Sequence, residues 1–227
     1  AKVEIWNPNP GSYTVEKTSD EKKALIDKAL DTWISGMLGA TKGYVNAWDV
    51  VNEPMSDWPD PTQLKTGVGK KLAADEFYWQ DYLGKDYAVR AIQLARKYGN
   101  ATDKLFINDY NLEYNLAKCD GLIEYVKYIE NKGARVDGIG TQMHISITTD
   151  TTKIDQMFQK LAASGKLIKV SELDIKVNTS SPTLENYAKQ AQMYQYVVKS
   201  FMKHVPEAQR YGITVWAVSD NSKEHTN

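Results

Sequence analysis

The chain has 227 residues, of which 42% are apolar and 25% are charged, and its formal net charge is -1. This composition is that of a globular domain and excludes a disordered chain. A net charge near zero argues against a non-specific nucleic-acid binder, because such a protein needs a surplus of basic residues. The single cysteine, Cys119, excludes an internal disulfide and any zinc site built from several cysteines. No apolar run reaches the roughly 18 residues of a membrane span, and the charged, proline-containing start does not resemble a signal peptide.

The first part of the chain is predicted to contain a tail followed by a helix. Residues 1–17 are interpreted as a tail or linker, because the proline-rich cluster at 7–11 cannot lie inside a helix or a central strand. A helix is expected to begin behind Thr18, since Thr18 and Glu21 have the spacing of a capping box. An amphipathic helix that packs against something apolar is predicted, because apolar residues recur every four positions at Leu25, Ala29, Trp33 and Met37, with Ile26, Leu30 and Ile34 alongside.

The rest of the chain alternates between strands and helices. A buried strand is predicted over 44–51, and it stops by Pro54, which cannot donate a hydrogen bond to a neighbouring strand. Residues 55–83 form a loop of a length that is often functional in compact domains. Further strands are predicted over 104–108, 136–142, 167–174 and 212–219, and further helices over 87–98, 116–131, 154–161 and 184–204.

This alternation predicts an α/β fold with a parallel sheet and right-handed crossovers. No glycine-rich phosphate fingerprint follows a strand, so the dinucleotide-binding fold is disfavoured. The competing fold is the closed (β/α)8 TIM barrel, in which catalytic groups stand at the carboxyl ends of several strands. Five strands are found here, whereas the barrel needs eight, so the chain is expected to carry about five βα units of a barrel. Either further polypeptide completes the sheet or the strand count is wrong.

Every predicted strand ends in hydrogen-bonding side chains, although the strand middles are apolar. Glu53 follows the first strand, and Glu172 lies near the end of the fourth. Strands three units apart face each other across the mouth of an eight-stranded ring, so these two carboxyl groups are expected to converge. Cleavage of a glycosidic bond needs such a pair, one to protonate the leaving oxygen and one to attack the anomeric carbon or activate water. The accompanying polar and aromatic residues are Asn52, Asn108, Asp109, Tyr110, Asn111, Gln142, His144, Asp174, Trp216, Ser219 and Asp220.

Simpler interpretations exist for single members of this set. A lone glutamate at a strand end is often a structural salt bridge or cap, and a lone histidine is more often a satisfied buried residue. Cys119 has no catalytic partner at a recognisable spacing and is interpreted as a small buried apolar residue. A metal site is disfavoured, because catalytic zinc takes two or three histidines and only His144 stands at a strand end. No metal and no other cofactor is therefore expected.

Five segments resemble, in order and spacing, motifs of glycoside hydrolase family 10, the endo-β-1,4-xylanases. WDVVNEP (48–54) resembles the acid/base motif, and VSELDI (170–175) resembles the nucleophile motif. FINDYN (106–111), GIGTQMH (138–144) and VWAVSD (215–220) are similar to the fifth, sixth and eighth strands of the family's barrel. The likeness covers about residues 18–221 and implies a TIM barrel that hydrolyses xylan with retention of anomeric configuration.

The resemblance also implies roles for individual residues. Glu53 would be the general acid/base and Glu172 the nucleophile, with His144 holding Glu172 and Asp174 steadying His144. The implied substrate-binding residues are Asn52 at the 2-hydroxyl of the sugar being cleaved, Gln142 beside it, Trp216 as the floor of that subsite, and Tyr110 and Asn111 on the leaving-group side. A retaining pair should have carboxyl groups about 5 to 5.5 Å apart. The pKa of Glu53 is expected to be raised and that of Glu172 lowered.

The sequence departs from the family pattern at its start, where the first three strands and their sugar-gripping residues are not found. Residues 1–17 are accordingly interpreted as a linker or the tail of an inserted carbohydrate-binding module, and 18–227 as the C-terminal part of a catalytic barrel. The implied partners are xylan or xylo-oligosaccharides, together with a missing N-terminal portion of the barrel or such a module. Two alternatives stay open: a catalytically incomplete fragment that at most binds carbohydrate, and a β-glucanase of a related barrel family. Family habit implies a secreted, periplasmic or cell-surface location.

Overall fold

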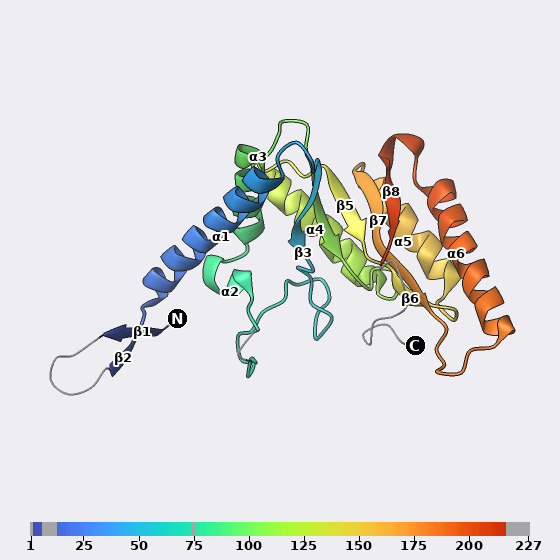
Figure 1. The fold of residues 1–227 in the computed structure, drawn as a ribbon, viewed down its shortest axis with the longest axis horizontal. Helices are drawn as coiled ribbons and strands as arrows, with labels where there is room; N and C mark the ends of the chain where they lie inside the picture. The colour runs from blue at the N-terminus through green and yellow to red at the C-terminus, as the bar shows by residue number, and fades with distance from the viewer. Residues whose placement is uncertain (1, 6–12, 74–75, 217–227) are drawn as a thin grey trace.

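A computed structural model describes residues 2–5, 13–73 and 76–216 of the chain. It starts with two short strands, β1 (Lys2–Ile5) and β2 (Tyr13–Glu16), which pair antiparallel (Figure 1). These strands lie in the predicted tail or linker, and the sequence did not predict them. The origin of this stretch in an inserted module stays a prediction.

The first helix, α1 (Ser19–Thr41), begins as its capping box predicts. The Thr18 hydroxyl accepts a hydrogen bond from the Glu21 backbone N–H at 3.3 Å, and the Glu21 carboxylate accepts one from the Thr18 backbone N–H at 2.8 Å. These two contacts satisfy backbone donors that a helix start leaves unpaired. The buried stripe of α1 is Leu30, Ile34 and Leu38, whereas Leu25, Trp33 and Met37 of the predicted apolar series are exposed.

The remaining strands form one parallel sheet. They are β3 (Ala47–Asn52), β4 (Lys104–Asp109), β5 (Gly138–Thr141), β6 (His144–Ser146), β7 (Leu167–Lys176) and β8 (Arg210–Val215). The order is β3-β4-β5-β7, with β8 on the far side of β7. β5 and β6 lie in series along β7, since β5 pairs with its first half and β6 with its end. Within the described residues the sheet therefore has five parallel strand positions in chain order, which is the arrangement that a partial TIM barrel requires.

Helices follow the strands as the alternation predicts (Figure 1). They are α2 (Trp79–Leu83), α3 (Tyr87–Tyr98), α4 (Leu116–Asn131), α5 (Thr151–Ala163) and α6 (Leu184–His204), with a short 3-10 helix η1 (Glu207–Gln209) before β8. The helix α2 lies inside the predicted loop 55–83 and was not predicted. The predicted last strand, 212–219, begins two residues earlier than expected, and its residues 217–219 lie outside the described part of the chain.

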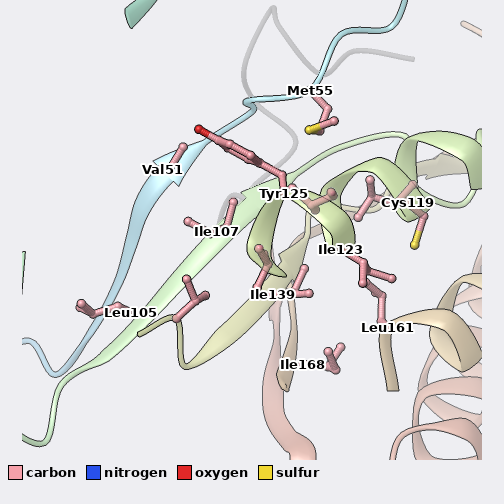
Figure 2. Packing of buried hydrophobic residues seen from close by; sticks show 14 of the residues in the cluster. Val51, Met55, Leu105, Ile107, Cys119, Ile123, Tyr125, Ile139, Leu161 and Ile168 are labelled. Carbon is pink, nitrogen blue, oxygen red and sulfur yellow. The ribbon is translucent and has the colours of Figure 1, made fainter. Parts of the chain in front are cut away.

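The core lies between the sheet and these helices. Figure 2 shows Leu105 and Ile107 of β4 beside Ile139 of β5 and Ile168 of β7, all of which are fully buried. The same cluster includes Ile123 of α4 and Leu161 of α5 and also Cys119, which confirms that the cysteine is a buried apolar residue. Burial of Cys119 raises the pKa of its thiol to about 12, so the thiol is inert.

On the other face of the sheet, the Asn108 side chain lies close against the backbone of the neighbouring strand. A Cβ atom added at Gly140 of β5 would lie 2.2 Å from Oδ1 of Asn108, so only glycine leaves room for this asparagine. The two residues are opposite each other in the β4–β5 pairing. The glycines predicted to allow close approach in this strand thus let Asn108 lie against the sheet beside the strand ends.

The long loop behind β3 is folded back on itself. The backbone N–H of Ser56 donates to the carbonyl of Gln63 at 2.8 Å, and that of Lys65 donates to the carbonyl of Pro54 at 2.8 Å. Helix α4 packs closely below it, because a Cβ atom at Gly121 would lie 2.7 Å from Cα of Thr62. The loop is therefore held both by its own ladder and by the helix beneath it.

Within the described residues, no helix has the length and apolar character that a membrane crossing requires. Among the described strands, β3 and β8 are the two edge strands of the parallel sheet.

Two glycine-to-alanine substitutions in helices should have opposite effects on stability. Gly121→Ala in α4 should lower the free energy of unfolding by about 1–3 kcal/mol, because the new methyl group meets loop backbone that cannot move aside freely. Gly36→Ala in α1 should raise it by about 0.5–1 kcal/mol, because a Cβ there meets nothing within 4 Å and alanine favours the helix. Urea unfolding of both variants measures the difference, and equal effects of one sign would contradict the close packing at Gly121.

Candidate active site

Glu53 directly follows β3, at the point where the backbone leaves the strand. Its φ angle is 54°, a left-handed conformation that is uncommon outside glycine, and its backbone N–H donates to the carbonyl of Asn108 at 2.8 Å. Its side-chain Oε1 accepts a hydrogen bond from Nε2 of Gln142 at 3.0 Å, and its Oε2 accepts one from Nζ of Lys65 at 3.2 Å. Each carboxylate oxygen thus has its own donor.

Glu172 lies on β7, and its carboxylate contacts two residues of the site. Its backbone N–H donates to the carbonyl of Gln142 at 3.2 Å. Oε1 accepts a hydrogen bond from Nδ2 of Asn108 at 3.2 Å, and Oε2 lies 3.3 Å from Nε2 of His144. The side chain is 17% exposed, so it is mostly buried yet reachable.

His144, the first residue of β6, connects Glu172 to a second carboxylate. Its Nδ1 lies 2.8 Å from Oδ2 of Asp174, the residue opposite it in the β6–β7 pairing. The hydrogen bond to Asp174, together with the negative charges of Asp174 and Glu172, raises the pKa of His144 above its ordinary value of 6.5, despite partial burial. The imidazole is therefore held in one orientation and biased towards its charged form.

Three side-chain amides join the two glutamates into one network. Oδ1 of Asn52 accepts hydrogen bonds from Nδ2 of Asn108 at 2.9 Å and from Nε2 of Gln142 at 3.3 Å. The same amide of Asn108 also donates to Glu172, and the same amide of Gln142 also donates to Glu53. The predicted convergence of the two carboxylates at one site is therefore observed. Their expected separation of about 5 to 5.5 Å stays a prediction.

The predicted direction of the Glu53 pKa shift is wrong for the free protein. Partial burial is the largest single influence and raises the pKa of Glu53, but the Gln142 hydrogen bond and the charge and hydrogen bond of Lys65 outweigh it, with a smaller contribution from Lys118. The pKa of Glu53 therefore lies below its ordinary value of 4.5. The sequence missed this because it did not place Lys65 at the site.

The predicted substrate-binding residues surround the same strand ends. The Tyr110 ring lies next to two ammonium groups, 4.6 Å from Nζ of Lys65 and 3.7 Å from Nζ of Lys118. Asn111 follows with a φ angle of 60°. The indole of Trp216 is 45% exposed and stands nearly perpendicular to the His144 ring, with 5.9 Å between the ring centroids. The predicted strand-end residues Ser219 and Asp220 lie outside the described part of the chain.

Three residues of the site were given no function by the sequence. Asn108 was noted only as a strand-end polar residue, although it bridges Asn52 and Glu172. Lys65 lies within the long loop, and the length of that loop was the only signal that it holds something functional. Lys118 sits in the first half of α4, where nothing in the sequence distinguishes it from a solvent-exposed lysine, yet it is fully buried.

The arrangement combines two carboxylates in different environments at the carboxyl ends of parallel strands. One faces an ammonium group and the other faces an imidazole. In the part of the chain that the structure describes, no three or more His, Cys, Asp or Glu residues are grouped so that they could hold a metal ion. Such a pair suits proton transfer and nucleophilic attack at an acetal carbon.

Comparison with known proteins matches this chain to a family. The model of glycosyl hydrolase family 10 matches residues 4–224. Endo-1,4-beta-xylanase A of Thermoanaerobacterium saccharolyticum is 30% identical over 96% of this chain and 18% of its own length. Endo-1,4-beta-xylanase A of Cellvibrio japonicus is 30% identical over 95% of this chain and 37% of its own length, and exoglucanase XynX of Acetivibrio thermocellus is 31% identical over 96% and 19%.

Solved structures give the same likeness at the level of the fold. Xylanase XynB from Paenibacillus barcinonensis, complexed with a conduramine derivative, superimposes with a TM-score of 0.74 at 28% identity, covering 88% of this chain and 59% of that one. A thermostable mutant of xylanase Xyn10A from Cellvibrio japonicus gives a TM-score of 0.72 at 28% identity, with coverage of 88% and 62%. The chain thus spans about 60% of the solved chains and less than half of these curated relatives.

The His144 ion pairs should make stability depend on pH in one direction. Because the folded pKa of His144 is raised, its contribution is fully present below the ordinary value of 6.5 and is lost as the pH rises through the folded value. The difference in free energy of unfolding between the wild type and His144→Asn should therefore shrink as the pH rises above 6.5. Urea unfolding from about pH 5 to 9 measures it.

The control for this prediction is Asp174→Asn, which removes the first cause of the shift. The imidazole of His144 should then titrate at a lower pH than in the wild type, as followed by NMR. A stability difference that stays constant across the pH range would contradict the prediction.

Proposed function

Because the chain belongs to glycosyl hydrolase family 10, we propose that it carries the two catalytic carboxylates of an endo-β-1,4-xylanase that acts with retention. The observation that supports this most is the amide network through which Asn52, Asn108 and Gln142 join Glu53 and Glu172. A glycosidase needs such a pair fixed around one sugar linkage.

In the proposed reaction Glu53 and Glu172 each act twice. Glu172 attacks the anomeric carbon while Glu53 gives its proton to the leaving glycosidic oxygen, so the C–O bond breaks and a covalent glycosyl-enzyme forms. Glu53, now a carboxylate, takes a proton from water, and the resulting hydroxide attacks the same carbon and releases Glu172. Two inversions at one carbon give net retention.

The hydrogen bonds around each carboxylate suit these roles. Asn108 and His144 hold Glu172 by one oxygen each, which limits its rotation. Glu53 has a lowered pKa in the free protein, so it is ready to act as a base. Bound sugar would add to the burial that already raises the pKa of Glu53, which favours the protonated form needed in the first step.

Substrate would bind over the same strand ends. As the family resemblance implies, we assign Asn52 to the 2-hydroxyl of the sugar being cleaved and Gln142 to the same subsite; both amides belong to the network between the two carboxylates. The exposed indole of Trp216 suits stacking on a sugar ring, and Tyr110 and Asn111 suit the leaving-group side. Xylan is the proposed polymer, because relatives are named endo-1,4-beta-xylanases and a related solved structure is titled as a complex with xylotriose.

A glucan is the second candidate substrate. The observation that favours it is the relative from Acetivibrio thermocellus, which is named an exoglucanase and is 31% identical over 96% of this chain.

A further part of the proposal concerns how the sheet is completed. Between α1, β3 and α3 lies an apolar hollow of about 350 Å³, lined by residues such as Trp33, Ile34, Trp48 and Ala91. Trp33 is 66% exposed, and Val215 at the other end of the sheet is 57% exposed. We propose that polypeptide carrying the remaining βα units of the barrel covers these two faces, with or without an inserted carbohydrate-binding module. The alternative is a catalytically incomplete fragment.

Removal of each carboxylate should leave a distinct kinetic signature. Glu53→Ala should lower kcat/KM on xylo-oligosaccharides by about 10²–10⁴-fold, because leaving-group protonation is lost. It should have much less effect on formation of the glycosyl-enzyme from an aryl xylobioside with a good leaving group, and added azide should release that intermediate as β-xylobiosyl azide and so restore turnover. Glu172→Ala should abolish hydrolysis of both substrates, because no covalent intermediate forms.

The matched control is Glu124→Ala, which removes an exposed glutamate of α4 and should leave the rates unchanged. A product released first as the α-anomer by the wild type would contradict retention. Turnover by the 227-residue chain alone as a monomer would contradict the fragment alternative.

Product analysis separates the two candidate substrates. Incubation with xylan should release xylo-oligosaccharides, whereas mixed-linkage β-glucan should release much less sugar under the same conditions. Faster release from β-glucan would contradict the proposed xylan specificity and favour the glucanase.

A further inference from the structure

We propose that Lys65 is a positioning residue for the acid/base carboxylate, delivered to Glu53 by the folded loop behind β3; this inference rests on the proposed function. Lys65 Nζ donates to Oε2 of Glu53 at 3.2 Å, while Gln142 occupies the other carboxylate oxygen. The Lys65 side chain is 23% exposed and that of Glu53 is 39% exposed, so the pair lies at the open side of the site.

The loop brings Lys65 back beside Glu53 through a short ladder. Met55 and Leu64 form an antiparallel bridge, and the backbone N–H of Lys65 donates to the carbonyl of Pro54 at 2.8 Å. Lys65 is thus fixed next to the residue that follows Glu53, although twelve positions separate the two side chains in sequence.

An ion cluster centred on Lys118 holds the base of this loop. Nζ of Lys118 lies 2.8 Å from Oδ1 of Asp57 in the loop and 3.1 Å from Oδ1 of Asp109 at the end of β4. The other oxygen of Asp109 accepts a hydrogen bond from the backbone N–H of Met55 at 2.9 Å. Lys118 and Asp109 are fully buried, so their half of the anchor is shielded from water, whereas the Asp57 side chain is 45% exposed.

The Tyr110 ring restricts where the Lys65 side chain can go. Nζ of Lys65 lies 4.6 Å from the centroid of this ring, within the range of a cation–π contact, and the Tyr110 hydroxyl donates to Asp57. The ring is therefore held by the same loop that carries Lys65. With the ring on one side and the Glu53 carboxylate on another, the ammonium group has a defined position.

This position gives Lys65 influence on both steps of the proposed reaction. An ammonium group can donate hydrogen bonds but cannot accept one, so it favours the carboxylate form of Glu53 and opposes its protonated form. The other charged or titratable groups on this side are Lys118, the phenol of Tyr110, and the carboxylates of Asp57 and Asp109 that contact them. Across the amide network stand Glu172 and the His144 imidazole. Lys65 makes the closest ionic contact with Glu53 among the described residues.

The test compares Lys65→Met with Lys65→Arg, and uses Lys71→Met as the matched control because Lys71 is an exposed lysine of the same loop region. The pH profile of kcat/KM is measured on an aryl xylobioside with a poor leaving group, with the longest form of the protein that hydrolyses xylan. The basic limb of this profile reports the protonated acid/base residue. In Lys65→Met this limb should move to higher pH, and in Lys65→Arg and Lys71→Met it should stay in place.

A second readout does not depend on turnover. In protein labelled with ¹³C at the glutamate carboxyls, the Glu53 signal is assigned by its loss in Glu53→Gln, and its titration midpoint should rise in Lys65→Met only. An unchanged midpoint and an unchanged basic limb in a folded Lys65→Met protein would overturn the inference. Absence of hydrolysis of any β-1,4-linked polymer by the wild type would instead overturn the proposed function, and the titration would still decide whether Lys65 acts on Glu53.

Discussion

The carboxylates of Glu53 and Glu172 meet at the carboxyl ends of the parallel strands. The amides of Asn52, Asn108 and Gln142 hold them there. Carboxylates at apolar strand ends are costly unless donors satisfy them, so this network is a condition for the site to exist in a folded protein. The three amides come from β3, β4 and the turn between β5 and β6, which neighbour one another in the sheet. The order of the strands therefore decides the composition of the network.

The chain leaves several strands through the same backbone conformation. The residues Glu53, Asn111, Met143 and Asn178 all have φ angles between 54° and 61°, and each stands one or two positions after a strand. Left-handed backbone is unfavourable for such side chains, so the surrounding packing must stabilise it. This is consistent with a rigid layer beneath the mouth, where β4 is buried along most of its length and Gly140 admits Asn108 against the sheet.

Much of the fold could be predicted because its signals are local. The spacing of apolar residues, the Thr18 capping box and the strand-stopping Pro54 all act within a few residues of their effects. The site residues were found for the same reason, since strand ends can be recognised in the sequence. The contacts of Lys65 and Lys118 could not be predicted, because each ion pair joins segments far apart in sequence, such as Lys118 with Asp57. The predicted pKa shift of Glu53 was wrong because its direction depends on the hydrogen bond from Gln142 and on the charge and hydrogen bond of Lys65, which join segments far apart in sequence.

The Lys65 ammonium beside Glu53 is compatible with the proposed role of Glu53, which has to be protonated in one step of the reaction and ionised in the other. In a double displacement, one form of the acid/base residue is needed in the first step and the other in the second, so a strong bias in either direction would slow one step. Burial pushes the pKa of Glu53 upwards, while Lys65 and Gln142 push it downwards. In the proposed reaction, a sugar bound over the site would increase burial, and departure of the leaving group would readmit water. The Lys65 ammonium would then oppose protonation of Glu53 in the first step and favour its carboxylate form in the second.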